Sequence, residues 1–188
     1  MKALCDVVVT SANVFKIIKN IPSEEIIFVP DSLMAKNMQI ELEQAGVKKN
    51  IISATAVCMV HDRFNSSMIE ETRARYSNLA VVSHPECTPE VTRASHYVGS
   101  TTTMMDYVIK TDFDYYLMLT ECGLVSRLQV EHPTKRFVGS CQLCPHMKKN
   151  SLQNILQVMQ NPTDKQIVKV KEEVRVKALR ALDQMFAM

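Results

Sequence analysis

Residues 96–144 contain three segments that decide the fold: HYVGSTT (96–102), YYLMLTE (115–121) and RFVGSCQLC (136–144). Each has aromatic, β-branched or other apolar residues near its start and polar or small residues after them, which is typical of a short buried strand followed by a turn. Helix-length amphipathic segments separate them. Strands that alternate with helices in this way indicate an α/β fold with a parallel sheet.

The same alternation runs through the rest of the chain. Strands are expected at Asp6–Val9, Ile26–Val29, Asn50–Ser53, Leu79–Val82, His96–Val98, Tyr115–Leu119 and Lys135–Val138. Helices are expected at Ala12–Lys19, Met34–Ala45, Ser67–Tyr76, Pro89–Ser95, Thr102–Ile109, Leu124–Val130, Leu152–Met159 and Glu172–Phe186.

The three opening segments have counterparts in the first half of the chain. VVVTSAN, IIFVPD and NIISATAVC follow one another with similar spacing, since 47 positions separate Ser11 from Cys58 and 44 separate Ser100 from Cys144. We therefore predict an internal repeat. The second half has one additional strand in front, LAVVSHPEC (79–87), without a counterpart. The repeat thus predicts that a strand and its following helix are missing before Met1, so that the chain is truncated.

Composition excludes several classes of protein. The 188 residues are 46% hydrophobic and 22% charged, with a net charge of +2 and no arginine-rich patch, which argues against a nucleic-acid partner. No apolar run approaches the roughly 18 residues that a membrane span needs, and the N-terminus does not read as a signal peptide. A cytoplasmic location is expected, with the six cysteines reduced or bound to a metal.

Polar residues gather where predicted strands end, which is where parallel sheets bind ligands. Ser11, Ser100 and Thr101 are hydroxyls at such ends, and they could cap the following helices or bind an anionic ligand there. His84 and Glu86 flank a proline at the end of an apolar strand, where they could bind a ligand or transfer protons. The remaining histidines without partner spacing are interpreted as surface or core residues, at positions His61, His96 and His132.

The cysteines leave several interpretations open. Cys5 and Cys122 read as buried thiols, and Cys87 could line a pocket without a role. Cys141 and Cys144 form a Cys-x-x-Cys that could be part of a zinc site, a redox pair or a cluster site. Cys58 and Cys144 hold matching repeat positions. One thiolate per repeat suits an iron–sulfur cluster on a pseudo-symmetry axis.

The motifs DVVVTSAN, IIFVPD, CMVHDRF, HPECTPEV, GSTTTM, LTECGLVSRL and CPHMKKNSL, in this order, resemble the quinolinate synthase family. The resemblance implies three pseudo-repeated, three-layer α/β/α units with short parallel sheets, of which two are present here. The second repeat would cover residues 1–65, the third 66–147, and a C-terminal helical segment 148–188 would pack on the absent first repeat.

The resemblance also implies a function. Family members condense iminoaspartate with dihydroxyacetone phosphate to quinolinate in NAD biosynthesis, using a [4Fe–4S] cluster with an open iron. L-aspartate oxidase would be the upstream supplier of iminoaspartate. Cys58 and Cys144 would be cluster ligands, with Cys141 as a less favoured substitute. Substrate contacts would fall on Ser11, Ser100, Thr101, His84 and Glu86, the last two also being catalytic.

The chain departs from the family pattern because the first repeat, with one cluster cysteine, has no match in it. We therefore expect a split subunit, a fragment or a decayed copy that is incomplete or inactive by itself, with a separate N-terminal polypeptide as the partner that would complete it. One alternative is a non-enzymatic module that binds zinc through Cys141, Cys144 and His146. Another is a thiol oxidoreductase that uses Cys141 and Cys144.

Overall fold

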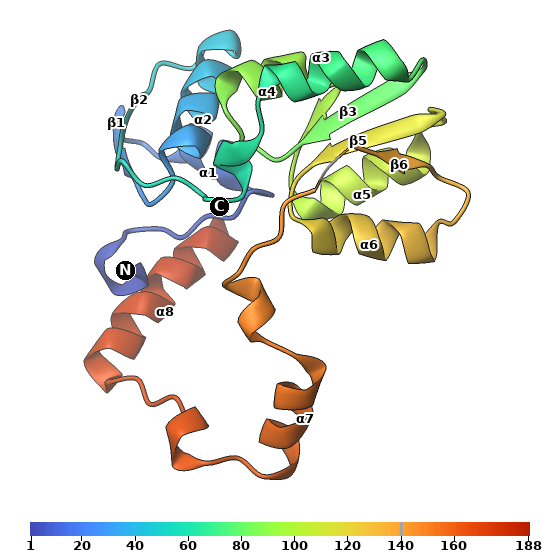
Figure 1. The fold of residues 1–188 in the computed structure, drawn as a ribbon. Coiled ribbons are helices and arrows are strands. Elements are labelled where there is room, and N and C mark those ends of the chain that lie inside the picture. Colours follow the sequence, from blue (N-terminus) through green and yellow to red (C-terminus); the bar gives the residue numbers. More distant parts are fainter. Residues whose placement is uncertain (140) are drawn as a thin grey trace. The chain divides into compact units, whose positions relative to one another are not determined.

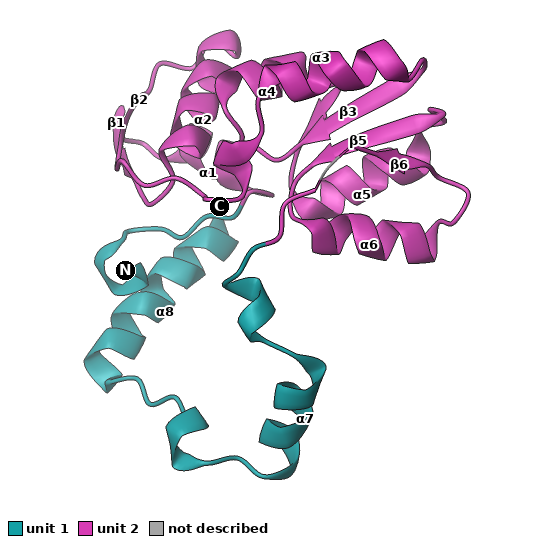
Figure 2. Cartoon of the chain, in the orientation of Figure 1, with its two compact units in different colours: residues 1–10, 144–188 teal, residues 11–143 magenta. Residues whose placement is uncertain are grey.

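A computed structural model describes residues 1–139 and 141–188 (Figure 1). The described chain divides into two compact units, one of residues 11–143 and one of residues 1–10 with 144–188 (Figure 2). The first unit is an α/β assembly and carries most of the buried core. The predicted repeat boundaries at residues 65 and 147 stay a prediction.

A four-stranded parallel sheet forms the larger part of the first unit. Its strands stand in the order β4-β3-β5-β6. Their bounds are β3 Leu79–Ser83, β4 Tyr97–Val98, β5 Tyr115–Leu119 and β6 Phe137–Val138. Helices α3 (Ser66–Arg75) and α4 (Pro89–Ala94) lie on one face, and α5 (Thr101–Lys110) and α6 (Cys122–Glu131) lie on the other (Figure 1). The predicted α/β/α layering and parallel pairing are thus confirmed.

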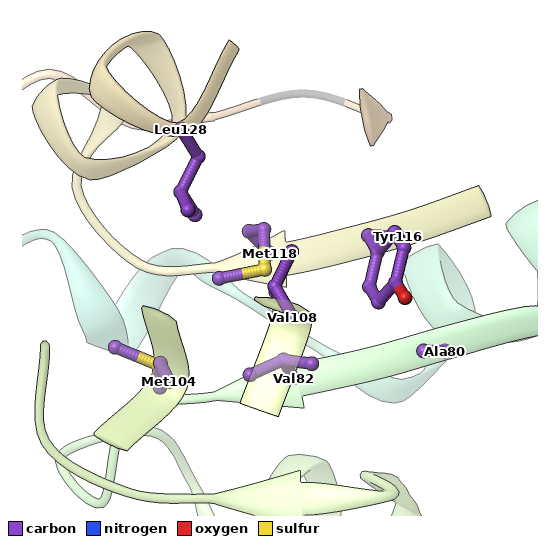
Figure 3. Packing of buried hydrophobic residues seen from close by; sticks show 7 residues of the cluster. All are labelled: Ala80, Val82, Met104, Val108, Tyr116, Met118 and Leu128. Atoms are coloured by element: carbon purple, nitrogen blue, oxygen red, sulfur yellow. The ribbon is translucent and has the colours of Figure 1, made fainter. Parts of the chain in front are cut away.

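The core of this sheet lies between the two central strands and the helices α5 and α6. The seven buried side chains drawn in Figure 3 come from β3, β5, α5 and α6: Ala80, Val82, Met104, Val108, Tyr116, Met118 and Leu128. The one hydroxyl among them is satisfied, because Tyr116 donates to the Thr111 carbonyl at 2.6 Å and accepts from the Phe113 N–H at 3.1 Å. The buried tyrosine therefore adds apolar area without an unpaired polar atom.

A smaller parallel sheet pairs β1 (Glu25–Phe28) with β2 (Asn50–Ser53). The crossover helix α2 (Ser32–Gln44) and helix α1 (Val14–Asn20) cover one side of it, where Ile26 and Phe28 are buried. On the opposite side Ile27 is 80% exposed and Ile52 is 49% exposed. This sheet therefore has only one packed face within the described chain.

The connections after β1 and after β5 are built alike. Asp31 accepts a hydrogen bond from a backbone N–H in the first turn of α2, and Glu121 does the same for α6, so each helix has an acidic N-cap. Each acidic residue also forms an isolated parallel bridge, Asp31 with Ala56 and Glu121 with Gln142. Cys58 and Cys144 each follow the bridged partner by two positions. The geometry agrees with the repeat seen in the sequence, while the number of repeats stays a prediction.

The prediction of a strand at Asp6–Val9 is wrong. Residues 6–9 form no strand in the structure, and the Val8 N–H instead donates to the Ala181 carbonyl at 3.1 Å. In the larger sheet the matching strand is β4, and β4 is paired only with β3. The described residues before β1 contain no counterpart of β3. An apolar stretch forms a strand only where a neighbouring strand is present to pair with it. The apolar pattern of residues 6–9 was therefore not sufficient to predict a strand.

The second unit contains helices α7 (Leu152–Gln160) and α8 (Glu172–Ala187), both close to their predicted bounds. Helix α8 packs against the short 3₁₀ turn at Lys2–Leu4, and Ala181 is buried. Helix α7 buries none of its residues within the described chain. Among the described residues, no helix has the length and apolarity that crossing a bilayer requires.

Candidate functional site

Four polar side chains meet where β3 and β5 end. His84 follows β3, Thr120 follows β5, and His61 comes from a 3₁₀ turn after β2. The His61 Nδ1 lies 2.8 Å from Glu86 Oε2, and its Nε2 lies 3.3 Å from Thr120 Oγ1. The rings of His61 and His84 stack with centroids 4.3 Å apart. We call His61, His84, Glu86 and Thr120, together with Cys58, the His61–Glu86 cluster.

The protonation of His84 follows from its contacts. The Glu86 backbone N–H donates to Nδ1 of His84 at 3.3 Å, so the ring proton of the neutral form sits on Nε2. Burial and, to a smaller extent, the neighbouring His61 lower the pKa of His84 to about 4, against the opposing effect of Glu86. His84 is therefore a neutral N–H donor near pH 7.

Glu86 is held as a carboxylate. Burial acts to raise its pKa, but the hydrogen bond with His61 and the nearby His84 outweigh burial and hold the pKa below its usual value. An ionised carboxylate in contact with one imidazole and beside another can accept a proton and share it with the ring. The arrangement suits acid–base chemistry on a bound substrate.

Cys58 lies beside this acid–base pair. One ligand atom from each of Cys58, His61 and Glu86 lies within 4.8 Å of the others, a spacing that could hold a metal ion. Burial raises the pKa of the Cys58 thiol, and a metal cation at the sulfur would reverse that effect. The Asp31 Oδ2 accepts the Cys58 backbone N–H at 2.8 Å, which fixes the loop that presents the thiol.

A cavity of about 430 Å³ lies beside the His84–Glu86 turn. Among the residues lining it are Ser11, Pro85, Arg93 and Ser100. Pro85 stands between the two site residues His84 and Glu86, and its carbonyl accepts a hydrogen bond from the Asn37 side chain at 2.7 Å. The turn thus has one side on the cavity and the other in the cluster.

The predicted hydroxyls behave differently from one another. Ser100 is the N-cap of α5, because its Oγ accepts from the Thr103 N–H at 3.3 Å. Ser11 does not cap α1, whose N-cap is Asn13. Both serines line the cavity, whereas Thr101 is exposed at the start of α5 and is outside the cavity lining. The structure therefore places Ser11 and Ser100 on one cavity, whereas Thr101, the residue after Ser100, is not part of its lining.

The structure corrects part of what the sequence indicated about the cysteines. Cys141 forms a disulfide with Cys122, so Cys122 is not a lone buried thiol. This pairing also removes Cys141, in this state, as a substitute cluster ligand, as a zinc ligand beside Cys144 and His146, and as a redox partner of Cys144. Sequence reasoning missed it because the two residues lie on different elements, brought together after β5 and β6. Cys58 and Cys144 keep reduced thiols.

Cys87 is structural rather than a lining residue. It is fully buried and its Sγ donates to the Leu119 carbonyl at 3.4 Å. Burial raises the pKa of its thiol to about 12, so it stays protonated.

His61 belongs to the candidate site, and sequence reasoning did not predict this. It is 7% exposed, in agreement with its interpretation as a core residue, but its contacts with Glu86 and Thr120 were not predicted. The available signal was its place three residues after Cys58. Its partners come from 25 and 59 positions further along, a distance at which spacing carries no information.

Comparison with known proteins gives the family. The family model described as "Quinolinate synthetase A protein" matches residues 1–187. The chain belongs to this family. The resemblance of its motifs to quinolinate synthase is thereby confirmed, and the chain is placed in an enzyme family of NAD biosynthesis.

Curated quinolinate synthases match nearly the whole chain. Quinolinate synthase 1 of Mesorhizobium japonicum is 35% identical over 98% of this chain and 55% of its own length. The Clostridium acetobutylicum quinolinate synthase is 36% identical over 98% of this chain and 60% of its own length. The Xylella fastidiosa quinolinate synthase is 34% identical over 100% of this chain and 53% of its own length. The chain thus spans a little over half the length of these quinolinate synthases.

Proposed function

We propose that the chain forms part of a quinolinate synthase that condenses iminoaspartate with dihydroxyacetone phosphate to quinolinate and releases phosphate and water. The observation that carries the proposal is the His61–Glu86 cluster. A neutral N–H donor, an ionised carboxylate and a second imidazole meet at the carboxyl ends of parallel strands, where α/β proteins bind ligands. Imine formation and loss of water both need such proton transfers.

The cavity beside this cluster suits anionic substrates. Two serines, Ser11 and Ser100, and one arginine, Arg93, line the same space. A guanidinium with hydroxyl donors matches a carboxylate or a phosphate. The family resemblance also implies a substrate contact at Thr101, which lies in the first turn of α5 but outside the lining of this cavity. His84 would donate from Nε2 to a substrate oxygen while Glu86 accepts a proton and shares it with His61.

The chain's cysteines would provide part of the ligands that an iron–sulfur cluster needs. Cys58 and Cys144 would each give a thiolate to a [4Fe–4S] cluster, and both are reduced in the structure. When bound, the cluster would supply a Lewis-acid iron for a substrate oxygen. With Cys141 in a disulfide and Cys87 buried and protonated, a further thiolate from a separate N-terminal polypeptide is proposed. The complete enzyme would be cytoplasmic and supplied with iminoaspartate by L-aspartate oxidase.

A single metal ion held by Cys58, His61 and Glu86 is the second candidate, because these three residues already lie together. It would make the chain a metal-binding module without quinolinate synthase activity. Thiolates bind both zinc ions and iron–sulfur clusters, so the types of residue present fit either group.

Metal analysis after anaerobic purification, followed by reconstitution with iron and sulfide, separates these proposals. The enzyme proposal expects iron with equimolar sulfide, lost in Cys58→Ala and Cys144→Ala and kept in the matched control Cys5→Ala. Zinc without sulfide, lost in Cys58→Ala but not in Cys144→Ala, supports the second candidate and overturns the first.

A further inference from the structure

Helix α2 places one amide side chain against the His84–Glu86 turn. Asn37 lies in the interior of α2, where asparagine is a poor helix former, and it is only 8% exposed. Helix α2 contacts α4, the helix that follows the turn (Figure 1). A buried amide needs hydrogen-bond partners, and the side chain of a helical residue finds them on a neighbouring element. The partners of Asn37 therefore indicate what this residue does.

The Asn37 side chain is fully used by the turn and by α4. Its Nδ2 donates to the Pro85 carbonyl and to the Cys87 carbonyl, both at 2.7 Å. Its Oδ1 accepts from the Thr92 hydroxyl at 2.9 Å. Carbonyl oxygens can only accept, so the NH₂ must face the turn and the amide oxygen must face the hydroxyl. One side chain thus holds the backbone on both sides of Glu86.

The ends of the turn are also held from within the larger sheet. The Cys87 N–H donates to the His84 carbonyl at 3.0 Å, and the Cys87 thiol donates to the Leu119 carbonyl at 3.4 Å. Between these ends the carboxylate of Glu86 reaches His61 Nδ1 at 2.8 Å. The direction in which Glu86 leaves the backbone therefore depends on the two carbonyls that Asn37 holds.

We propose that Asn37 is a positioning residue for the His61–Glu86 cluster. It fixes the backbone at 85–87 so that Glu86 meets His61 and the rings of His61 and His84 stack. Asn37 transfers no proton itself, because the protein uses both of its N–H groups and its oxygen. A misplacement of about 1 Å at a reacting group can cost roughly 100-fold in rate. The effect on rate rests on the proposed function, whereas the effect on geometry does not.

NMR of the chain by itself tests the geometry. Asn37→Ala leaves two carbonyls of the turn without their donor, so the turn is expected to shift. Gln39→Ala is the matched control from the same helix, because its contacts with the Lys49 carbonyl and the Ile51 N–H do not touch the turn. Nuclear Overhauser effects between the rings of His61 and His84 are expected to be lost in Asn37→Ala and kept in Gln39→Ala.

Two results would overturn the positioning role. One is an Asn37→Ala chain that keeps the ring contacts of the wild type. The other is loss of these contacts in the control as well, which would make them a consequence of general stability.

Kinetics of the chain assembled with an N-terminal quinolinate synthase polypeptide test the consequence for the reaction. Asn37→Ala is expected to lower kcat and kcat/KM alike, by about 10- to 100-fold, while Gln39→Ala changes neither. In a Glu86→Gln background Asn37→Ala is expected to have little further effect, because Asn37 acts through Glu86. Equal losses in both backgrounds overturn the proposal.

A milder variant decides if Asn37→Ala does not fold. Thr92→Val keeps the shape of the side chain but removes the hydroxyl that orients the Asn37 amide. It is expected to weaken the contacts between the rings of His61 and His84, and unchanged contacts overturn the proposal.

The two kinds of measurement separate positioning from activity. Ring contacts that depend on Asn37, in a chain whose wild-type assembly forms no quinolinate, support the positioning role and reject the proposed function. Quinolinate formed equally fast by wild type and Asn37→Ala supports the function and rejects the positioning role.

Discussion

The carboxylate of Asp31 joins the start of helix α2 to the loop that carries Cys58. Its Oδ1 accepts the Met34 N–H at 2.7 Å and its Oδ2 accepts the Cys58 N–H at 2.8 Å. One residue thus caps a helix and orients a thiol 27 positions away. Burial and the nearby Glu86 raise the pKa of this carboxyl, so its two N–H contacts act against the cost of keeping it charged.

Two substitutions of Asp31 separate its two roles. Asp31→Ala removes both contacts and is expected to lower the free energy of unfolding by about 1–2 kcal/mol through the lost cap. Asp31→Asn can keep the cap through Oδ1 but presents an NH₂ to the Cys58 N–H. It is expected to keep most of the stability yet bind less iron after reconstitution. Urea unfolding and iron analysis measure both effects, and full iron binding by Asp31→Asn would show that the Cys58 contact is not needed.

Removing His61 is expected to impair proton transfer without unfolding the chain. His61→Gln takes away the imidazole that contacts Glu86 and Thr120, so the pKa of Glu86 should rise. Loss of a positioned proton-transfer group typically costs roughly 10²- to 10⁴-fold in rate. The measurement is kcat of the assembled enzyme, with His132→Gln as the control. A His61→Gln enzyme with the kcat of the control contradicts the role given to His61.

Acidification is expected to weaken the fold through His84. Because burial lowers the pKa of His84 to about 4, the folded state stays neutral while the unfolded chain takes up a proton below about pH 6.5. Stability contributed by the neutral ring is present above pH 6.5 and is lost as the pH falls toward 4, by up to about 3 kcal/mol. Urea unfolding at pH 7.5 and pH 5 is compared for wild type and His84→Gln. We expect the smaller loss of stability in the variant, and equal losses would count against a buried neutral His84.

Thiol counting tests the cysteine pairing. The structure has four reduced cysteines and one disulfide between Cys122 and Cys141. Under denaturing conditions without reductant, four thiols are expected to react, and six after reduction. Cys141→Ser is expected to leave iron binding unchanged because the sulfur of Cys141 is bonded to Cys122. Iron lost in Cys141→Ser would restore the substitute-ligand interpretation.

The sequence predicted best those elements whose own residues determine whether they are buried. Strand β5 and the strand at 50–53 were predicted to the residue, because apolar runs between turn signals encode burial locally. Residues 6–9 have an equally apolar pattern and form no strand, since pairing depends on a neighbour that the described chain does not contain.

The residues of the candidate site also differ in whether the sequence could predict them. His84 and Glu86 could be predicted because both stand in one turn after a buried strand. The role of His61 could not, because its partners Glu86 and Thr120 come from other strand ends that only the folded sheet brings together. The disulfide of Cys141 was missed for the same reason, as its partner lies on helix α6.

Quinolinate formation by the completed enzyme tests the central claim most directly. The chain is combined anaerobically with an N-terminal quinolinate synthase polypeptide, reconstituted with iron and sulfide, and given iminoaspartate and dihydroxyacetone phosphate. We predict quinolinate from the mixture but not from either polypeptide, with loss of at least about 100-fold in Glu86→Gln and no change in Glu90→Gln, whose side chain is exposed. A mixture that binds a cluster but forms no quinolinate, or one that is equally active with Glu86→Gln, would contradict the account.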